Sequence, residues 1–265
     1  MSGRVLLEVK SVGGKTRMNR ADFYGLMEGK SDLDYEIYLN THTLLTAQKS
    51  FDALCNQDEL MFQIVHQVEE LWMKLIAYSL LNINEYIEQT ETFRVLTLFG
   101  RVSRILRLMT QQLDVLETMS PKEYQQIRLQ LGNGSGQESP GFRTLLKMPE
   151  HLWKSYKEQY LDKRGLSVET VYNSEYAHDD AYVIAEALTE FDELFQTFRI
   201  HHLLLIQRSI GGNAKSLKGR SVTLLEQGAR HHFFPELWEI RSRMTDEWGG
   251  EYGVKRDKIQ SEPKG

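Results

Sequence analysis

Two long stretches of helical periodicity, separated by only three residues, most constrain what this chain can fold into. In residues 58–88 apolar side chains recur at spacings of three and four, and in residues 92–119 they again fall on one side of a helix. The two stripes comprise Met61, Val65, Val68, Trp72, Leu75 and Tyr78, then Val95, Leu98, Val102, Ile105, Leu108 and Leu116. The sequence has only five prolines and no alternating strand pattern, so we predict an all-α fold.

Helix-end signals organise the rest of the chain. Ser120-Pro121-Lys122-Glu123 forms a capping box with proline at the first helical position, so a short helix begins here. Residues 143–161 and 178–210 again have helical periodicity, and a pair of glycines ends the second. Residues 35–48 are also compatible with helix. We therefore expect one all-α domain over 35–255.

The two ends of the chain differ from this domain in composition. Residues 1–34 are polar and contain several glycines, which predicts a mobile or partner-dependent arm. Residues 256–265 are mostly charged or polar, and we expect a disordered tail there.

Composition excludes several classes of protein. A net charge of −5 gives no sign of a nucleic-acid partner. The single cysteine, Cys55, excludes an internal disulfide framework and a cysteine-based zinc site. No apolar run approaches the roughly 20 residues of a membrane helix, and the start does not read as a signal peptide. We expect a soluble cytoplasmic protein that binds neither nucleic acid nor membrane.

A histidine on the apolar side of a long helix is the first candidate for chemistry. His202 shares its stripe with Phe195, Phe198 and Leu205. Such a histidine is usually a core residue bonded to a neighbour, yet a neutral imidazole facing an apolar pocket is also what an axial heme ligand requires. The pattern alone leaves both interpretations open. No Cys-x-x-Cys-His motif is present, so any heme would be held non-covalently.

Three further residues could act with it. His66 follows Phe62 by one turn, either as a half-buried polar residue or as a group that hydrogen-bonds a ligand. Tyr124 and Arg128 also lie one turn apart, and the arginine fork could bind a substrate carboxylate or simply face solvent.

Two other patterns are weaker. Glu175 and His178 match the Glu-x-x-His of di-iron bundles, but no second copy exists, so we interpret the match as chance. Lys215, Lys218 and Arg220 form a basic loop that is either solvated or an anion contact.

Five segments, taken in order, resemble segments of the tryptophan 2,3-dioxygenase superfamily. They are residues 35–48, 58–76, 115–136, 198–212 and 233–241. The resemblance implies an all-α helical bundle that encloses a b-type heme and assembles as a homotetramer, or at least a homodimer. It also implies an amino-acid substrate and dioxygen.

Residue roles follow from the same resemblance. His202 falls on the axial heme ligand and His66 on the distal histidine near the indole nitrogen, whereas His201 does not align with the ligand. Arg128 matches the residue that pairs with the substrate carboxylate, and Ser216 the hydroxyl that contacts its ammonium group. The remaining substrate contacts implied are Phe62, Tyr124, Leu131 and, lent by a neighbouring subunit, Tyr35 and Tyr38.

The chain also departs from the family pattern. Residues 215–221 replace a glycine-rich loop with Lys-Ser-Leu-Lys-Gly-Arg-Ser, which is closer to relatives of the maremycin pathway type that form 2-oxindoles. Leu113 stands where the family has a tryptophan beside the heme. Relatives that hydroxylate tyrosine attach their heme through a cysteine four residues after the axial histidine. This chain has Ile206 at that position, so we do not expect it to be a tyrosine hydroxylase of this kind.

We therefore expect heme-dependent oxygenation of the indole C2–C3 bond of L-tryptophan or a substituted tryptophan, such as β-methyltryptophan. The loop favours insertion of one oxygen atom to give a 2-oxindole. The alternative is a tryptophan 2,3-dioxygenase that gives N-formylkynurenine. A non-catalytic heme sensor or carrier and a helical interaction module without cofactor are the rivals from other classes.

Overall fold

The computed structural model describes residues 20–132, 134–175, 177–213, 215, 219, 228, 230–248 and 252–255. These residues form helices and no β-strand, so the predicted all-α fold is confirmed. Backbone contacts divide the chain into two units, Met1–Leu54 and Cys55–Gly265. The domain boundaries given above remain predictions, and residues 256–265 lie outside the described part.

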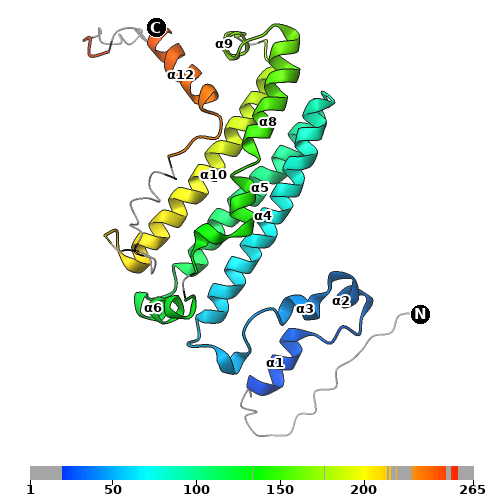
Figure 1. Cartoon of the computed structure of the whole chain (residues 1–265), viewed down its shortest axis with the longest axis vertical. Coiled ribbons are helices and arrows are strands. Elements are labelled where there is room, and N and C mark those ends of the chain that lie inside the picture. Colours follow the sequence, from blue (N-terminus) through cyan, green and yellow to red (C-terminus); the bar gives the residue numbers. More distant parts are fainter. Residues whose placement is uncertain are drawn as a thin grey trace, which may run out of the picture. The chain divides into compact units, whose positions relative to one another are not determined.

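Three long helices build the larger unit: α4 (Glu59–Glu88), α5 (Thr92–Leu116) and α10 (Asp180–Ile210). Figure 1 shows them side by side, and α5 packs on both of the others. The side-chain amide of Gln112, near the end of α5, donates to the Val65 carbonyl, near the start of α4, at 3.3 Å. The two helices are therefore antiparallel.

Helix α10 runs in the same direction as α5. The rings of Phe99 and Phe191 lie 6.3 Å apart near the start of both helices, and His201 Nδ1 lies 3.2 Å from the Thr110 carbonyl further along. Because α4 and α5 are antiparallel, α10 is antiparallel to α4 (Figure 1). A position later along α4 therefore matches a position earlier along α10.

The core of this unit differs in part from the predicted stripes. Tyr78 and Leu108 are 65% and 48% exposed. Helix α4 packs against α5, α7 and α8, so its buried face is broader than one stripe and is displaced from it. The buried apolar residues of α4 are Val65, Met73, Ile76, Leu80, Ile83 and Ile87, and those of α5 include Phe99, Leu106, Met109 and Leu113.

The predicted helix over 143–161 is divided. It comprises α7 (Pro140–Leu145), α8 (Pro149–Tyr156) and a π-helical turn η3 (Lys157–Leu161). Pro149 occupies the first turn of α8. Proline has no backbone N–H to donate to the carbonyl four residues earlier, so one continuous helix is interrupted here.

Shorter elements complete the larger unit. As predicted, Ser120 caps α6 (Pro121–Gln130), and its hydroxyl accepts a hydrogen bond from the Glu123 amide at 3.5 Å. The others are η2 (Gly136–Glu138), η4 (Asp162–Arg164), α9 (Val168–Tyr172) and α12 (Pro235–Trp248).

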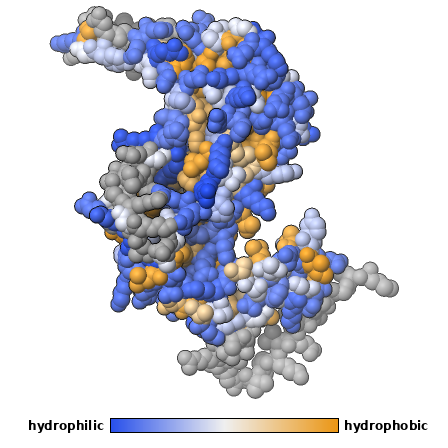
Figure 2. Space-filling model, in the orientation of Figure 1, coloured by the Kyte–Doolittle hydropathy of each residue, from blue (hydrophilic) through white to orange (hydrophobic). Residues whose placement is uncertain are grey.

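The N-terminal unit contains α1 (Arg20–Glu28), α2 (Asp34–Leu39), α3 (Thr41–Leu45) and η1 (Phe51–Ala53). A helix therefore lies inside the range predicted as an arm. Figure 2 shows that most of the surface in view is hydrophilic, with apolar side chains exposed in separate patches. No helix among the described residues is long and apolar enough to span a bilayer. The cytoplasmic location stays a prediction.

Candidate active site

A cavity of about 480 Å³ lies within the larger unit, between α4 and α10. Helix α5, the segment 136–146 and the described residues after α10 close it. Its residues are His66, Glu69, Glu70, Met73, Leu113, Gly136, Gln137, Ser139, Phe142, Leu146, Phe198, Arg199, His202, Leu203, Ile206, Gly228 and His231. Apolar side chains form much of the wall, and both predicted histidines face the space.

His202 reaches the cavity from α10. Its ring is stacked with that of Phe198 at 6.3 Å between centroids, and a side chain at Gly136 would stand 3.9 Å from His202 Cε1. Neither imidazole nitrogen has a hydrogen-bond partner within the described part of the chain. Burial and, to a smaller extent, the nearby His66 lower the pKa of His202 to about 4. The imidazole is therefore neutral near pH 7, with a lone pair available to a metal.

His66 reaches the same cavity from α4 and is held differently. Its Nδ1 lies 2.7 Å from the Phe62 carbonyl, which can only accept, so this nitrogen carries the proton. Burial lowers the pKa of His66, so its Nε2 is left as a hydrogen-bond acceptor at neutral pH. The sequence left open whether this residue donates or accepts, and the geometry favours accepting.

Phe62 connects the cavity to the short helix α6. Its ring lies 4.1 Å from that of His66 and 6.3 Å from that of Tyr124. Burial raises the pKa of Tyr124, and the Arg128 charge acts on it in the opposite direction, so these two side chains are neighbours as predicted. The structure thus brings together four of the predicted site residues, next to one end of the cavity.

The other predicted site residues do not line the cavity, or they lie outside the described residues. Arg128 donates from Nη2 to the Lys215 carbonyl at 2.6 Å, and Leu131 is 42% exposed. Ser216 lies outside the described residues. Tyr35 and Tyr38 belong to the N-terminal unit and are exposed, as a contact lent to another subunit requires.

Several residues of the cavity were not predicted. Glu69 and Arg199 are both largely buried and line it. Glu70 accepts hydrogen bonds from the Ser139 hydroxyl and from the Gly141 amide, and so ties α4 to the start of α7. Charged residues at helical spacing read as a solvated face, so the pattern gave no signal for them.

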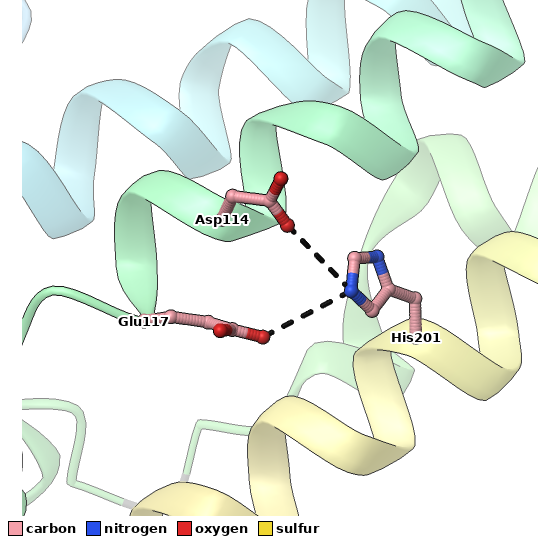
Figure 3. A group of neighbouring side chains, drawn as sticks. All are labelled: Asp114, Glu117 and His201. Carbon is pink, nitrogen blue, oxygen red and sulfur yellow. Dashed lines mark ion pairs between the residues drawn. The ribbon is translucent and has the colours of Figure 1, made fainter.

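His201, the neighbour of His202, points away from the cavity. Figure 3 shows its ring directed at Asp114 of α5 and at Glu117, which directly follows that helix. Its Nε2 lies 3.6 Å from Asp114 Oδ1 and 3.9 Å from Glu117 Oε1. Arg208 pairs with Glu117 at 3.3 Å from the same helix as His201. These side chains connect α5 and α10, and His201 has partners outside the cavity; that it is not the heme ligand stays a prediction.

The chain is similar in sequence to known proteins over most of its length. The sequence profile of the tryptophan 2,3-dioxygenase family matches residues 25–163, more than half of the chain. The tryptophan 2,3-dioxygenase of Myxococcus xanthus is 30% identical over 80% of this chain and 89% of its own length. The chain belongs to the tryptophan 2,3-dioxygenase family.

Two further members support this placement. The tryptophan 2,3-dioxygenase of Arthrobacter is 27% identical over 88% of this chain and 99% of its own length. That of Exiguobacterium sibiricum is 27% identical over 81% and 94%. The predicted family is confirmed, and membership of the tryptophan 2,3-dioxygenase family makes the protein an oxygenase. The profile match includes His66 and Arg128, and it ends before His202.

The cavity fits the heme that membership of this family implies. The His202 imidazole is unpartnered, neutral and directed into a largely apolar space, which is what an axial ligand to a planar macrocycle needs. A carboxyl oxygen of Glu69 is buried without a partner in the same wall. An unsatisfied buried polar atom indicates a missing bound molecule or water.

Proposed function

We propose that this protein is a heme-dependent tryptophan 2,3-dioxygenase that converts L-tryptophan and dioxygen into N-formylkynurenine. The observation that carries the proposal is the cavity in which an unpartnered histidine from α10 faces a histidine from α4. Heme b held by His202 would supply the binding and activation of dioxygen. The family membership supports this chemistry.

His66 orients the indole in this proposal. Its Nε2 is an acceptor at neutral pH because Nδ1 donates to the Phe62 carbonyl. The indole N–H is a donor, so the two are complementary. The Phe62 ring, 4.1 Å from that of His66, packs on the same aromatic substrate.

Arg128 and Ser216 would hold the amino-acid end, Arg128 through the carboxylate and Ser216 through the ammonium group. Arg128 lies one turn from Tyr124 on α6, and the Tyr124 ring lies 6.3 Å from that of Phe62. A carboxylate held by Arg128 would therefore let the indole reach the Phe62 and His66 rings. The Lys215 carbonyl occupies part of the guanidinium, so the substrate carboxylate would compete with it or bind the remaining N–H groups. Leu131 and, from a neighbouring subunit, Tyr35 and Tyr38 complete the pocket in this proposal.

The proposal also specifies that both atoms of dioxygen are retained in the product. The loop over 215–221 favoured one atom and a 2-oxindole, but most of that loop lies outside the described residues. The relatives named above all carry the dioxygenase name, so the dioxygenase alternative is better supported than the monooxygenase reading. Retention of both atoms also balances without electrons from outside.

We also propose a homo-oligomer, since a pocket residue lent by a neighbour requires one. Tyr35 and Tyr38, 71% and 88% exposed, are the residues that such a neighbour would use. Replacement of both by serine should leave heme binding intact and raise KM for tryptophan. Normal KM in that variant would contradict the shared pocket.

A turnover assay tests the proposed function. Heme-loaded protein supplied with a reductant, L-tryptophan and dioxygen should form a product that absorbs at longer wavelength than tryptophan. Arg128→Leu should raise KM by about 10- to 100-fold, since a charge-assisted pair contributes about 1.5–3 kcal/mol. The exposed Lys122→Leu on the same helix is the matched control and should leave KM unchanged. A wild-type protein that binds heme and never consumes tryptophan would contradict the proposal.

A further inference from the structure

Glu69 is a buried acid for which the proposed function has no use. Its side chain lines the cavity and the residue is only 8% exposed. Oxygen Oε1 is shielded and has no hydrogen-bond partner within the described chain, whereas the Gln112 side chain hydrogen-bonds the carboxyl group. A native protein seldom leaves such an oxygen unsatisfied inside its core unless the group serves a bound molecule or water, or has a redox or catalytic role.

The charges around Glu69 do not neutralise it. Glu70, the next residue on α4, is a second acid and raises the pKa of Glu69. Across the cavity, the Arg199 guanidinium donates to the carbonyls of Gly228 and His231 rather than to an acid. No ion pair with Glu69 occurs among the residues that the structure describes. Burial raises its pKa to about 7, so protonated and ionised forms are both populated near neutral pH.

The remaining titratable groups that face the cavity are His66 from α4, His202 from α10 and His231 after it. Glu69 follows His66 by three residues on α4, one turn along the helix and on the same side. His202 stands on the antiparallel helix across the same cavity. A charge in a space of low dielectric acts strongly on another charge that enters it.

We propose that Glu69 is a redox-tuning residue that, by gaining or losing its proton, sets the ratio of ferrous to ferric iron in the heme. This inference rests on the proposed heme site. An ionised carboxylate stabilises the more positive ferric state, and a neutral carboxyl group does not. Reduction by an external one-electron donor is therefore coupled to uptake of one proton at Glu69: ferric heme, an electron and a proton give ferrous heme and a neutral acid.

The midpoint potential of the heme-loaded protein tests this inference directly. It is measured by spectroelectrochemical titration with dithionite for the wild type and Glu69→Gln, at a pH well below 7 and a pH well above 7. Above pH 7, we expect the variant to hold a ferrous-to-ferric ratio about tenfold higher at a fixed potential, or ~59 mV for a one-electron couple. Below pH 7, the two proteins should agree, because Glu69 is then neutral in both.

Two further variants keep the test decisive. Glu85→Gln removes an exposed acid from the same helix and should leave the potential unchanged at both values of pH. Glu69→Asp retains a titratable carboxyl group and should retain the pH-dependent step, even where Glu69→Gln binds heme poorly.

The outcomes separate this inference from the proposed function. Equal potentials for wild type and Glu69→Gln at high pH would overturn the tuning role while leaving the heme site intact. An equal offset at every pH would also overturn it, because a structural effect does not follow ionisation. A wild-type protein that takes up no heme would overturn both.

Discussion

The imidazoles of His66 and His202 line one cavity from two antiparallel helices, close enough for the charge of His66 to lower the pKa of His202. Their bonding is unequal. His66 is fixed by the Phe62 carbonyl, and His202 has no partner within the described part of the chain. A fixed acceptor suits substrate orientation, whereas a free nitrogen suits a metal ligand.

This inequality predicts opposite effects of two substitutions. His202→Ala should abolish the ordinary Soret spectrum of the heme-loaded protein, since the proposed iron ligand is lost. His66→Ala should keep the Soret band and raise KM for tryptophan by about tenfold, the equivalent of one hydrogen bond of ~1.4 kcal/mol. His201→Ala is the matched control because its ring points away from the cavity. A normal spectrum in His202→Ala would contradict the ligand assignment.

The stability of the heme-free protein should depend on pH through His202. Its pKa is about 4 in the folded chain against 6.5 in the unfolded chain, so the unfolded chain binds more protons between these values. The free energy of unfolding should therefore be complete above pH 6.5 and decrease by up to about 3 kcal/mol as pH falls to about 4. His66 contributes in the same direction.

Urea unfolding near pH 7 and near pH 4.5 measures this dependence. His202→Leu should reduce the loss of stability at the lower pH, and His151→Asn, at an exposed position, should leave it unchanged. A wild-type protein equally stable at both values would contradict the buried neutral imidazole.

Gly141 marks a close approach of α7 to α4. A Cβ atom there would lie 2.7 Å from Met73 Cβ and 2.8 Å from Glu70 Oε2. Gly141→Ala should therefore lower the free energy of unfolding by about 1–3 kcal/mol in denaturant titration. Gly100→Ala, inside α5 with no atom within 4 Å of the added methyl, should instead raise it by about 0.5–1 kcal/mol. Equal effects of the two substitutions would refute the close contact.

Asp192 anchors the C-terminal segment before α12. It is fully buried, and one carboxylate oxygen accepts from the amides of Phe233 and Phe234 and from the Trp238 indole. Its other oxygen accepts from Gln196. In Asp192→Asn an N–H donor replaces one of these acceptors whichever way the amide turns. We expect a loss of about 2–3 kcal/mol of stability. The exposed Glu193→Gln should change it little, and an equally stable Asp192→Asn would show that this anchor is unnecessary.

Much of the fold followed from local sequence rules. The capping box at Ser120 and the glycine pair after Ile210 act through the nearest few residues, so they can be read directly and agree with the structure. The exposed Tyr78 and Leu108 could not be predicted, because a helix that packs against several neighbours buries more than one stripe. The helix predicted over 143–161 is interrupted at Pro149, although helical periodicity continues across this position. Proline removes one backbone hydrogen bond without changing the spacing of apolar residues, so periodicity does not show the break.

The candidate site divides in the same way. His66, Phe62 and His202 were predicted as site residues from segments on single helices, and their roles stay predictions. Glu69 and Arg199 were not, since a charged residue in a helical pattern reads as solvated until the neighbouring helices show that it is buried. Whether the His202 imidazole has a hydrogen-bond partner likewise depends on how the helices pack together. The periodicity of the sequence cannot show this.

Mass spectrometry of the product formed under ¹⁸O-labelled dioxygen tests whether L-tryptophan is dioxygenated at a heme held by His202. We expect N-formylkynurenine that carries both labelled atoms. A 2-oxindole product with a single labelled atom would contradict it and restore the monooxygenase interpretation of the 215–221 loop.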